Sequence, residues 1–105
     1  MANAWGIPTD VEKAALVRDT VCVYCGVAFG SERRTKRSWE HIINDVKVAT
    51  LESIALCCIG CNAFKGAKTL VDWIASPQAK RRGVSAHTLA PVVLAALLGK
   101  AHLDA

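Results

Sequence analysis

Two cysteine pairs are the first feature of the sequence with clear chemical meaning. In each pair two residues separate the cysteines, and 32 residues separate the pairs: Cys22 and Cys25, then Cys58 and Cys61. Four thiolates at such spacing are a common donor set for a structural zinc ion. We therefore predict zinc here, and a zinc closed by four cysteines would stabilise the fold without performing chemistry. The alternative, cysteines that only pack in the core, suits the unpaired Cys57 better than two matched pairs.

A second group of residues could carry out hydrolysis. His41 follows Glu40 in "SWEHIIN", which reads as a strand, so the two side chains should point to opposite faces. A histidine can accept a proton from water near neutral pH, and a carboxylate can bind a hard divalent ion. Asn62 directly follows the last zinc cysteine and could complete that second metal site. Lys65, one helical turn later, could bind a phosphate.

Each of these residues also has a simpler interpretation. His41 could be a structural histidine, Glu40 and Lys65 surface charges, and Asn62 a helix cap. For any one residue taken alone, the simpler interpretation is favoured. Their order around the predicted zinc frame is what favours an active site.

The combined pattern resembles the HNH endonuclease family. It consists of Cys-x-x-Cys, an acidic residue with His-Ile, and Leu-Cys-Cys-x-x-Cys-Asn-x-x-Lys-Gly, and it covers about residues 20–68. The resemblance implies an α+β fold: a small zinc-stapled ββα-metal (His-Me finger) core with flanking helices. It also implies that His41 is the general base and that Glu40 and Asn62 bind a catalytic Mg²⁺, Mn²⁺ or Ni²⁺ ion. Lys65 would contact the phosphate.

The sequence departs from the family pattern at three positions. Glu40 stands where the family usually has Asp, Asn44 where it often has Pro, and Ser53 where it has the asparagine that orients the histidine. Serine can still form a hydrogen bond but has a shorter reach. Ser53 therefore favours an alternative function, a zinc-knuckle protein that binds nucleic acid with little or no cleavage. A nuclease selective for branched DNA is a further alternative.

Basic residues suggest a polyanionic partner. The chain has 13 Lys and Arg against 9 Asp and Glu, a formal charge of +4, with a second basic run at residues 80–82. The residues expected to contact DNA, duplex or branched, are Arg33, Arg34, Lys36, Arg37, Lys65 and Lys68. Phosphate contacts position a substrate without reading its sequence, so we expect weak sequence preference. The alternative for the basic loop is a solvated surface.

The sequence also predicts the elements that must position these residues. We expect a helix over about residues 10–18 with a capping box of Thr9 and Glu12, a turn over residues 22–26, and a polar loop over residues 30–38. The strand should be followed by a turn at Asn44 and Asp45 and a helical turn over residues 50–55. A helix should open at the second cysteine pair and stop near Gly66, a helix capped by Thr69 should end at Pro77, and residues 85–99 should be helical.

We interpret residues 1–105 as one domain, with a motif core over residues 20–68 and a helical extension over residues 69–105. We find no secretory signal or membrane span, so we expect a cytoplasmic protein in which zinc is favoured over disulfides. The C-terminal helix either completes the core or forms a homodimer. His87 and His102 should be structural or solvent-exposed, and Tyr24 and Trp39 should pack around the zinc and the strand.

Overall fold

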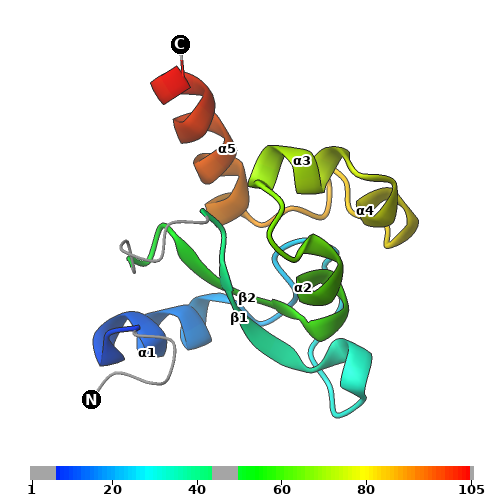
Figure 1. Cartoon of the computed structure of the whole chain (residues 1–105). Helices are drawn as coiled ribbons and strands as arrows, with labels where there is room; N and C mark the ends of the chain where they lie inside the picture. Colours follow the sequence, from blue (N-terminus) through cyan, green and yellow to red (C-terminus); the bar gives the residue numbers. More distant parts are fainter. Residues whose placement is uncertain (1–6, 44–49, 105) are drawn as a thin grey trace.

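The structure is a computed structural model that describes residues 7–43 and 50–104, with side chains up to residue 99. Two antiparallel strands lie at its centre, between helices α1 and α2 (Figure 1). The elements are α1 (Thr9–Arg18), η1 (Arg33–Thr35), β1 (Arg37–His41), β2 (Ile54–Cys58), α2 (Ile59–Lys65), α3 (Leu70–Ala75), α4 (Pro77–Arg81) and α5 (Pro91–Asp104). This mixed architecture confirms the α+β class.

The two strands fix the positions of the candidate residues. Arg37 pairs with Cys58 at one end of the sheet, and His41 pairs with Ile54 at the other. The predicted strand in "SWEHIIN" is confirmed as β1. The helical turn predicted over residues 50–55 is wrong, because the chain turns at residues 50–53 and enters β2 at Ile54. All five residues of β2 are buried, so the strand lacks the alternation of polar and apolar residues that identifies a half-buried strand.

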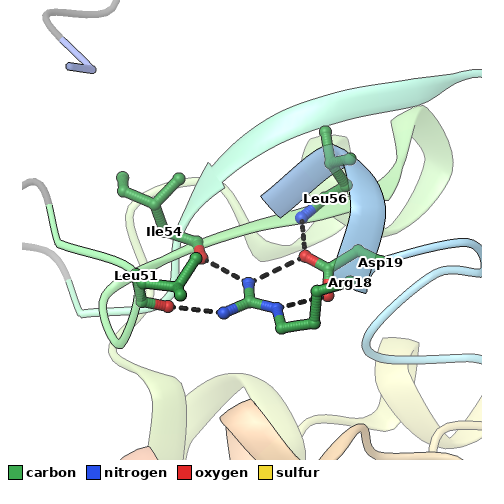
Figure 2. Close-up of polar contacts among 5 residues, drawn as sticks. All are labelled: Arg18, Asp19, Leu51, Ile54 and Leu56. Carbon is green, nitrogen blue, oxygen red and sulfur yellow. Dashed lines mark hydrogen bonds and ion pairs between the residues drawn. The ribbon is translucent and has the colours of Figure 1, made fainter. Parts of the chain in front are cut away.

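The outer edge of β2 is covered by the end of α1. The Asp19 carboxylate accepts a hydrogen bond from the Leu56 amide at 3.0 Å, and the Arg18 guanidinium donates to the Ile54 carbonyl at 2.7 Å (Figure 2). Arg18 also binds both carboxylate oxygens of Asp19 and the Leu51 carbonyl. The Val23 amide donates to the Leu56 carbonyl at 3.2 Å. These two side chains and one backbone amide thus replace hydrogen bonds that a third strand would make, which permits a buried edge in a two-stranded sheet.

Helix α1 occurs where the sequence predicts it, but its predicted capping box is wrong. The helix begins at Thr9 itself, so Pro8 occupies the N-cap position, and the Glu12 amide donates to the Pro8 carbonyl at 2.9 Å. The polar loop over residues 30–38 is confirmed in its first part and contains the short turn η1. The turn predicted at Asn44 and Asp45 lies outside the described residues.

The helices after the sheet agree with most of the predictions. Helix α2 stops at Gly66, whose φ of 51° suits glycine, and Thr69 caps α3 by accepting from the Asp72 amide. Pro77 ends α3 and begins α4. The predicted tail helix starts too early at residue 85, because α5 begins at Pro91, a residue suited to a first helical turn.

The segment before α5 is bound to the first cysteine turn. The Thr88 hydroxyl donates to the Tyr24 carbonyl at 2.7 Å, and the Ala90 amide donates to the Val23 carbonyl at 2.9 Å. The start of α5 adds the buried side chains of Val93 and Ala96 to the core. None of the helices in residues 7–43 and 50–104 has the length and apolar character needed to cross a membrane.

Candidate metal centre and adjoining residues

The four paired cysteines converge on one point. The sulfur atoms of Cys22, Cys25, Cys58 and Cys61 all lie within 4.8 Å of one another, and those of Cys25 and Cys58 are 3.8 Å apart. A tetrahedral zinc ion with Zn–S bonds of about 2.3 Å places its sulfurs about 3.8 Å apart. The donor set and its spacing therefore fit a structural zinc ion, in agreement with the sequence prediction.

Backbone amides near the cysteines point at the sulfurs. Cys22 Sγ accepts from the amides of Tyr24 and Cys25 at 3.4 and 3.5 Å, and Cys58 Sγ accepts from the Cys61 amide at 3.4 Å. The first pair lies on a tight turn in which Gly26 has a φ of 78°. The second pair bridges the end of β2 and the start of α2. Amide donors stabilise sulfur in its anionic form, the form that binds metal.

Arg82 is a further partner of this centre. Its Nε lies 3.3 Å from Cys61 Sγ and its terminal nitrogen 3.4 Å from Cys58 Sγ. Gly60 makes room for it, because a Cβ at that position would lie 2.3 Å from the guanidinium. A cation close to two thiolates offsets part of the negative charge of a four-cysteine site.

The thiols influence one another's protonation. The pKa of Cys58 lies far below the usual value of a thiol, because the thiols of Cys22 and Cys61 donate hydrogen bonds to it, as do the Cys61 amide and Arg82. The hydrogen bond with Cys58 raises the pKa of Cys22 to about 11. Cys57, which we expected to be core filler, is fully buried, and burial raises its pKa far above the usual value. Cys57 also lies outside the group of four cysteines whose sulfur atoms converge.

Glu40 and Lys65 lie together in the interior. Lys65 Nζ is 3.2 Å from Glu40 Oε2, the same oxygen that accepts from the Tyr24 hydroxyl at 2.7 Å. Lys65 is 0% exposed and Glu40 only 6%. Burial, followed by the charge of Glu40, raises the pKa of Tyr24, so the phenol remains a donor. A lysine that binds phosphate should face solvent, whereas Lys65 points at Glu40 in the interior.

Asn62 connects α2 to β1. Its amide nitrogen donates to Ser38 Oγ at 3.0 Å and to the Trp39 carbonyl at 3.1 Å. A carbonyl can only accept, so this contact identifies the nitrogen side of the amide. Both amide hydrogens are therefore used, and Oδ1 is turned away from these two partners. Asn62 is thus held against the strand that carries Glu40 and His41.

His41 and Ser53 lie at the far end of the sheet from the cysteines. His41 is half-buried at the end of β1, and Ser53 directly precedes its strand partner Ile54. Ser53 is buried, and its hydroxyl accepts from the Thr50 amide at 3.0 Å and lies 3.2 Å from the Thr50 carbonyl. These contacts stabilise the turn that leads into β2.

The predicted DNA-contacting residues separate into two groups. Five are exposed, namely Arg33, Arg34, Lys36, Arg37 and Lys68, whereas Lys65 is buried. Lys68 donates to the Phe64 carbonyl at 2.8 Å. Arg33 and Arg34 lie in η1 and line a hollow that also includes residues of α2 and α4.

Sequence reasoning missed two partners of the candidate residues. Arg82 was noted only as part of a basic run, since a contact across 21 positions leaves no local signal. The Tyr24 hydroxyl was missed because the tyrosine was expected only to pack near the zinc.

A comparison with family models found no match, and neither did searches of curated proteins and of solved structures. The HNH resemblance therefore rests on the motif residues alone.

Proposed function

We propose that this protein is a zinc-stabilised HNH endonuclease that hydrolyses DNA phosphodiester bonds. The observation that supports it best is that residues next to the four converging cysteines position two side chains with oxygen donors, Glu40 and Asn62. Tyr24, between the first two cysteines, binds Glu40, while Asn62, directly after the last cysteine, binds the backbone of β1. A closed four-thiolate site would serve as the scaffold, and the chemistry would take place at the neighbouring residues.

The oxygens left over by these contacts suit a hard divalent ion. The Tyr24 and Lys65 contacts both fall on Glu40 Oε2, and the Asn62 contacts use only its nitrogen. Glu40 Oε1 and Asn62 Oδ1 are therefore the atoms that would hold Mg²⁺ or a similar ion. When bound, such an ion supplies charge stabilisation at a phosphate.

His41 is the proposed general base. It is half-buried at the end of β1, next to Glu40 in the chain, so it can remain reachable by water. Its imidazole would accept the proton of the attacking water. Lys65 takes a different role from the one its motif position suggests, because it neutralises Glu40 and holds it in place. Exposed arginines would supply the phosphate contacts.

A second candidate function is nucleic-acid binding without cleavage. One observation favours it: Glu40 already has a buried ammonium and a phenol as partners and is almost inaccessible to solvent. A divalent ion there would have to share the carboxylate with Lys65. Ser53, whose hydroxyl is bound to Thr50, also has a shorter side chain than the asparagine of the family and so a shorter reach toward His41.

Nicking of supercoiled plasmid by the Asn62→Ala variant tests the proposed metal role. Loss of one oxygen ligand should weaken the ion, so the variant should nick slowly at low Mg²⁺ and recover partly as Mg²⁺ increases. Asn62→Asp keeps an oxygen ligand but loses the amide hydrogens that bind Ser38 and Trp39, so it separates metal binding from the contact with β1 and should need less Mg²⁺ than Asn62→Ala. If both variants show the wild-type Mg²⁺ dependence, Asn62 holds no catalytic ion.

A further inference from the structure

A hollow of about 570 Å³ lies between η1, α2 and α4. Four arginines line it, two from η1 and two from the end of α4 and the residue after it, together with an aromatic and an amide side chain: Arg33, Arg34, Arg81, Arg82, Phe64 and Gln78. No acidic side chain contributes among the described residues. The four positive charges come from segments almost 50 positions apart, so the sequence alone shows two basic runs and not one site.

The aromatic ring in this hollow is accessible. Phe64 is 48% exposed, and the Arg82 guanidinium lies 5.7 Å from the centre of its ring. Arg82 is held in turn by the sulfurs of Cys58 and Cys61. The ring and the guanidinium therefore form a platform that the metal centre keeps in place. A half-exposed aromatic ring among arginines is the combination that binds unpaired bases by stacking and their phosphates by charge.

We propose that this hollow binds an unpaired nucleotide of a nucleic-acid strand, with the base stacked on Phe64 and the phosphates on Arg33, Arg34 and Arg81. The volume falls in the range of pockets that enclose small ligands, and a nucleotide fits that range. A continuous duplex keeps its bases stacked inside, so it would use the arginines and leave Phe64 without a partner. Gln78 offers both a donor and an acceptor to the edge of a base.

The position of the hollow relates it to the proposed active site. Ile59, which lines the hollow, directly follows Cys58, the strand partner of Arg37. His41 lies four residues beyond Arg37 on β1, and at roughly 3.3 Å per residue these two residues are about 13 Å apart. The inference rests on the proposed function only in this respect: if the protein is a nuclease, its preferred substrate has an unpaired strand a few nucleotides from the cut.

Fluorescence anisotropy with zinc-loaded full-length protein and no added Mg²⁺ tests the binding. The probes are a labelled oligothymidine of about twelve nucleotides, an abasic strand of equal length and a matching duplex. We expect oligothymidine to bind more tightly than the other two. Phe64→Ala should weaken oligothymidine binding about tenfold and leave abasic binding unchanged, whereas Phe64→Trp should preserve both.

Charge reversal provides the matched control for the arginines. Arg81→Glu should weaken binding of both single strands, and more strongly than Lys80→Glu, which makes the same change at an exposed neighbour outside the hollow. Zinc content and helical circular dichroism should match wild type in every variant. Equal effects of Phe64→Ala on oligothymidine and the abasic strand would overturn the proposal, as would tighter binding of the duplex.

Failure of the nucleotide site and failure of the proposed nuclease activity give different experimental results. If plasmid is never nicked but Phe64→Ala selectively weakens oligothymidine binding, the hollow is supported and the nuclease is refuted. If plasmid is nicked and Phe64→Ala binds every probe like wild type, the nucleotide site is refuted and the nuclease stands.

Discussion

At the scale of single residues, the contact between Lys65 and Glu40 changes how the motif is understood. A lysine with no exposed surface is rare and needs a charged or polar partner. Glu40 is that partner, and its Oε2 atom also accepts a hydrogen bond from the Tyr24 hydroxyl. The motif lysine thus belongs to the interior of this protein. Because a buried charge left alone is costly, the two side chains should be strongly coupled in stability.

Lys65→Met should lower the free energy of unfolding by about 3 kcal/mol, because Glu40 would remain buried without its cation. Adding Glu40→Gln should restore much of that loss, since neither remaining group would be charged. Lys68→Met is the control, because Lys68 is exposed, and should change stability by less than about 0.5 kcal/mol. Urea unfolding of the zinc-loaded variants measures these differences. Additive effects of the two interior substitutions would show that the pair is not coupled.

The residues that could be predicted from the sequence are those whose chemistry depends on local spacing. The two cysteine pairs converge as expected, because the spacing of metal ligands is visible directly in the sequence. The partners of those residues could not be predicted. Arg82 reaches Cys61 from 21 positions away, and Lys65 on α2 pairs with Glu40 on β1, 25 positions earlier in the chain. Such contacts depend on tertiary packing, which no short pattern records.

At the scale of elements, strand β2 is an example of a fully buried segment whose secondary structure the hydrophobic pattern does not predict. Its five residues, Ile54–Cys58, are all buried, so periodicity could not separate strand from helix. The hydrogen-bonding groups on the outer edge of β2 bind Arg18 and Asp19 at the end of α1 (Figure 2) and the Val23 amide. By contrast, α2 and α3 could be located from their sequence, because Gly66 follows the end of α2, Thr69 caps α3 and Pro77 follows its end.

Asp19→Ala should destabilise the protein by roughly 2 kcal/mol, because the Leu56 amide would be buried without an acceptor and Arg18 would lose its ion pair. Asp19→Asn, which can still accept from Leu56, should cost less. Asp10→Ala on the exposed first turn of α1 is the matched control and should have little effect. Thermal unfolding of the three variants gives their order of stability. Equal stability of Asp19→Ala and Asp10→Ala would show that the contact between Asp19 and the Leu56 amide is unimportant.

At the scale of the whole molecule, the metal centre joins both halves of the chain. The first cysteine turn binds the segment before α5 through Tyr24 and Val23, and the second pair links β2 to α2. Arg82 connects the same centre to the end of α4. A small domain of this kind gains much of its stability from a bound metal. Zinc affinity should therefore report on the packing between α2 and α4.

Arg82→Leu should weaken zinc binding by about 10- to 100-fold, because the thiolates lose a cationic donor. Gly60→Ala should act in the same direction, since its Cβ would displace the guanidinium. In the Arg82→Leu background, Gly60→Ala should add little further loss. Competition with a chromogenic chelator measures the affinity of each variant. Fully additive losses in the double variant would mean that Gly60 does not act through Arg82.

The proposed reaction is tested most directly by the rate of plasmid nicking with and without His41. Zinc-loaded wild-type protein should nick supercoiled DNA when Mg²⁺ or Mn²⁺ is added. His41→Ala should be at least about 100-fold slower, because it removes the proton acceptor, while its zinc content and DNA binding stay at wild-type levels. Equal nicking rates for wild type and a contaminant-free His41→Ala preparation would contradict the mechanism. The absence of nicking by both would contradict the nuclease and leave nucleic-acid binding as the function.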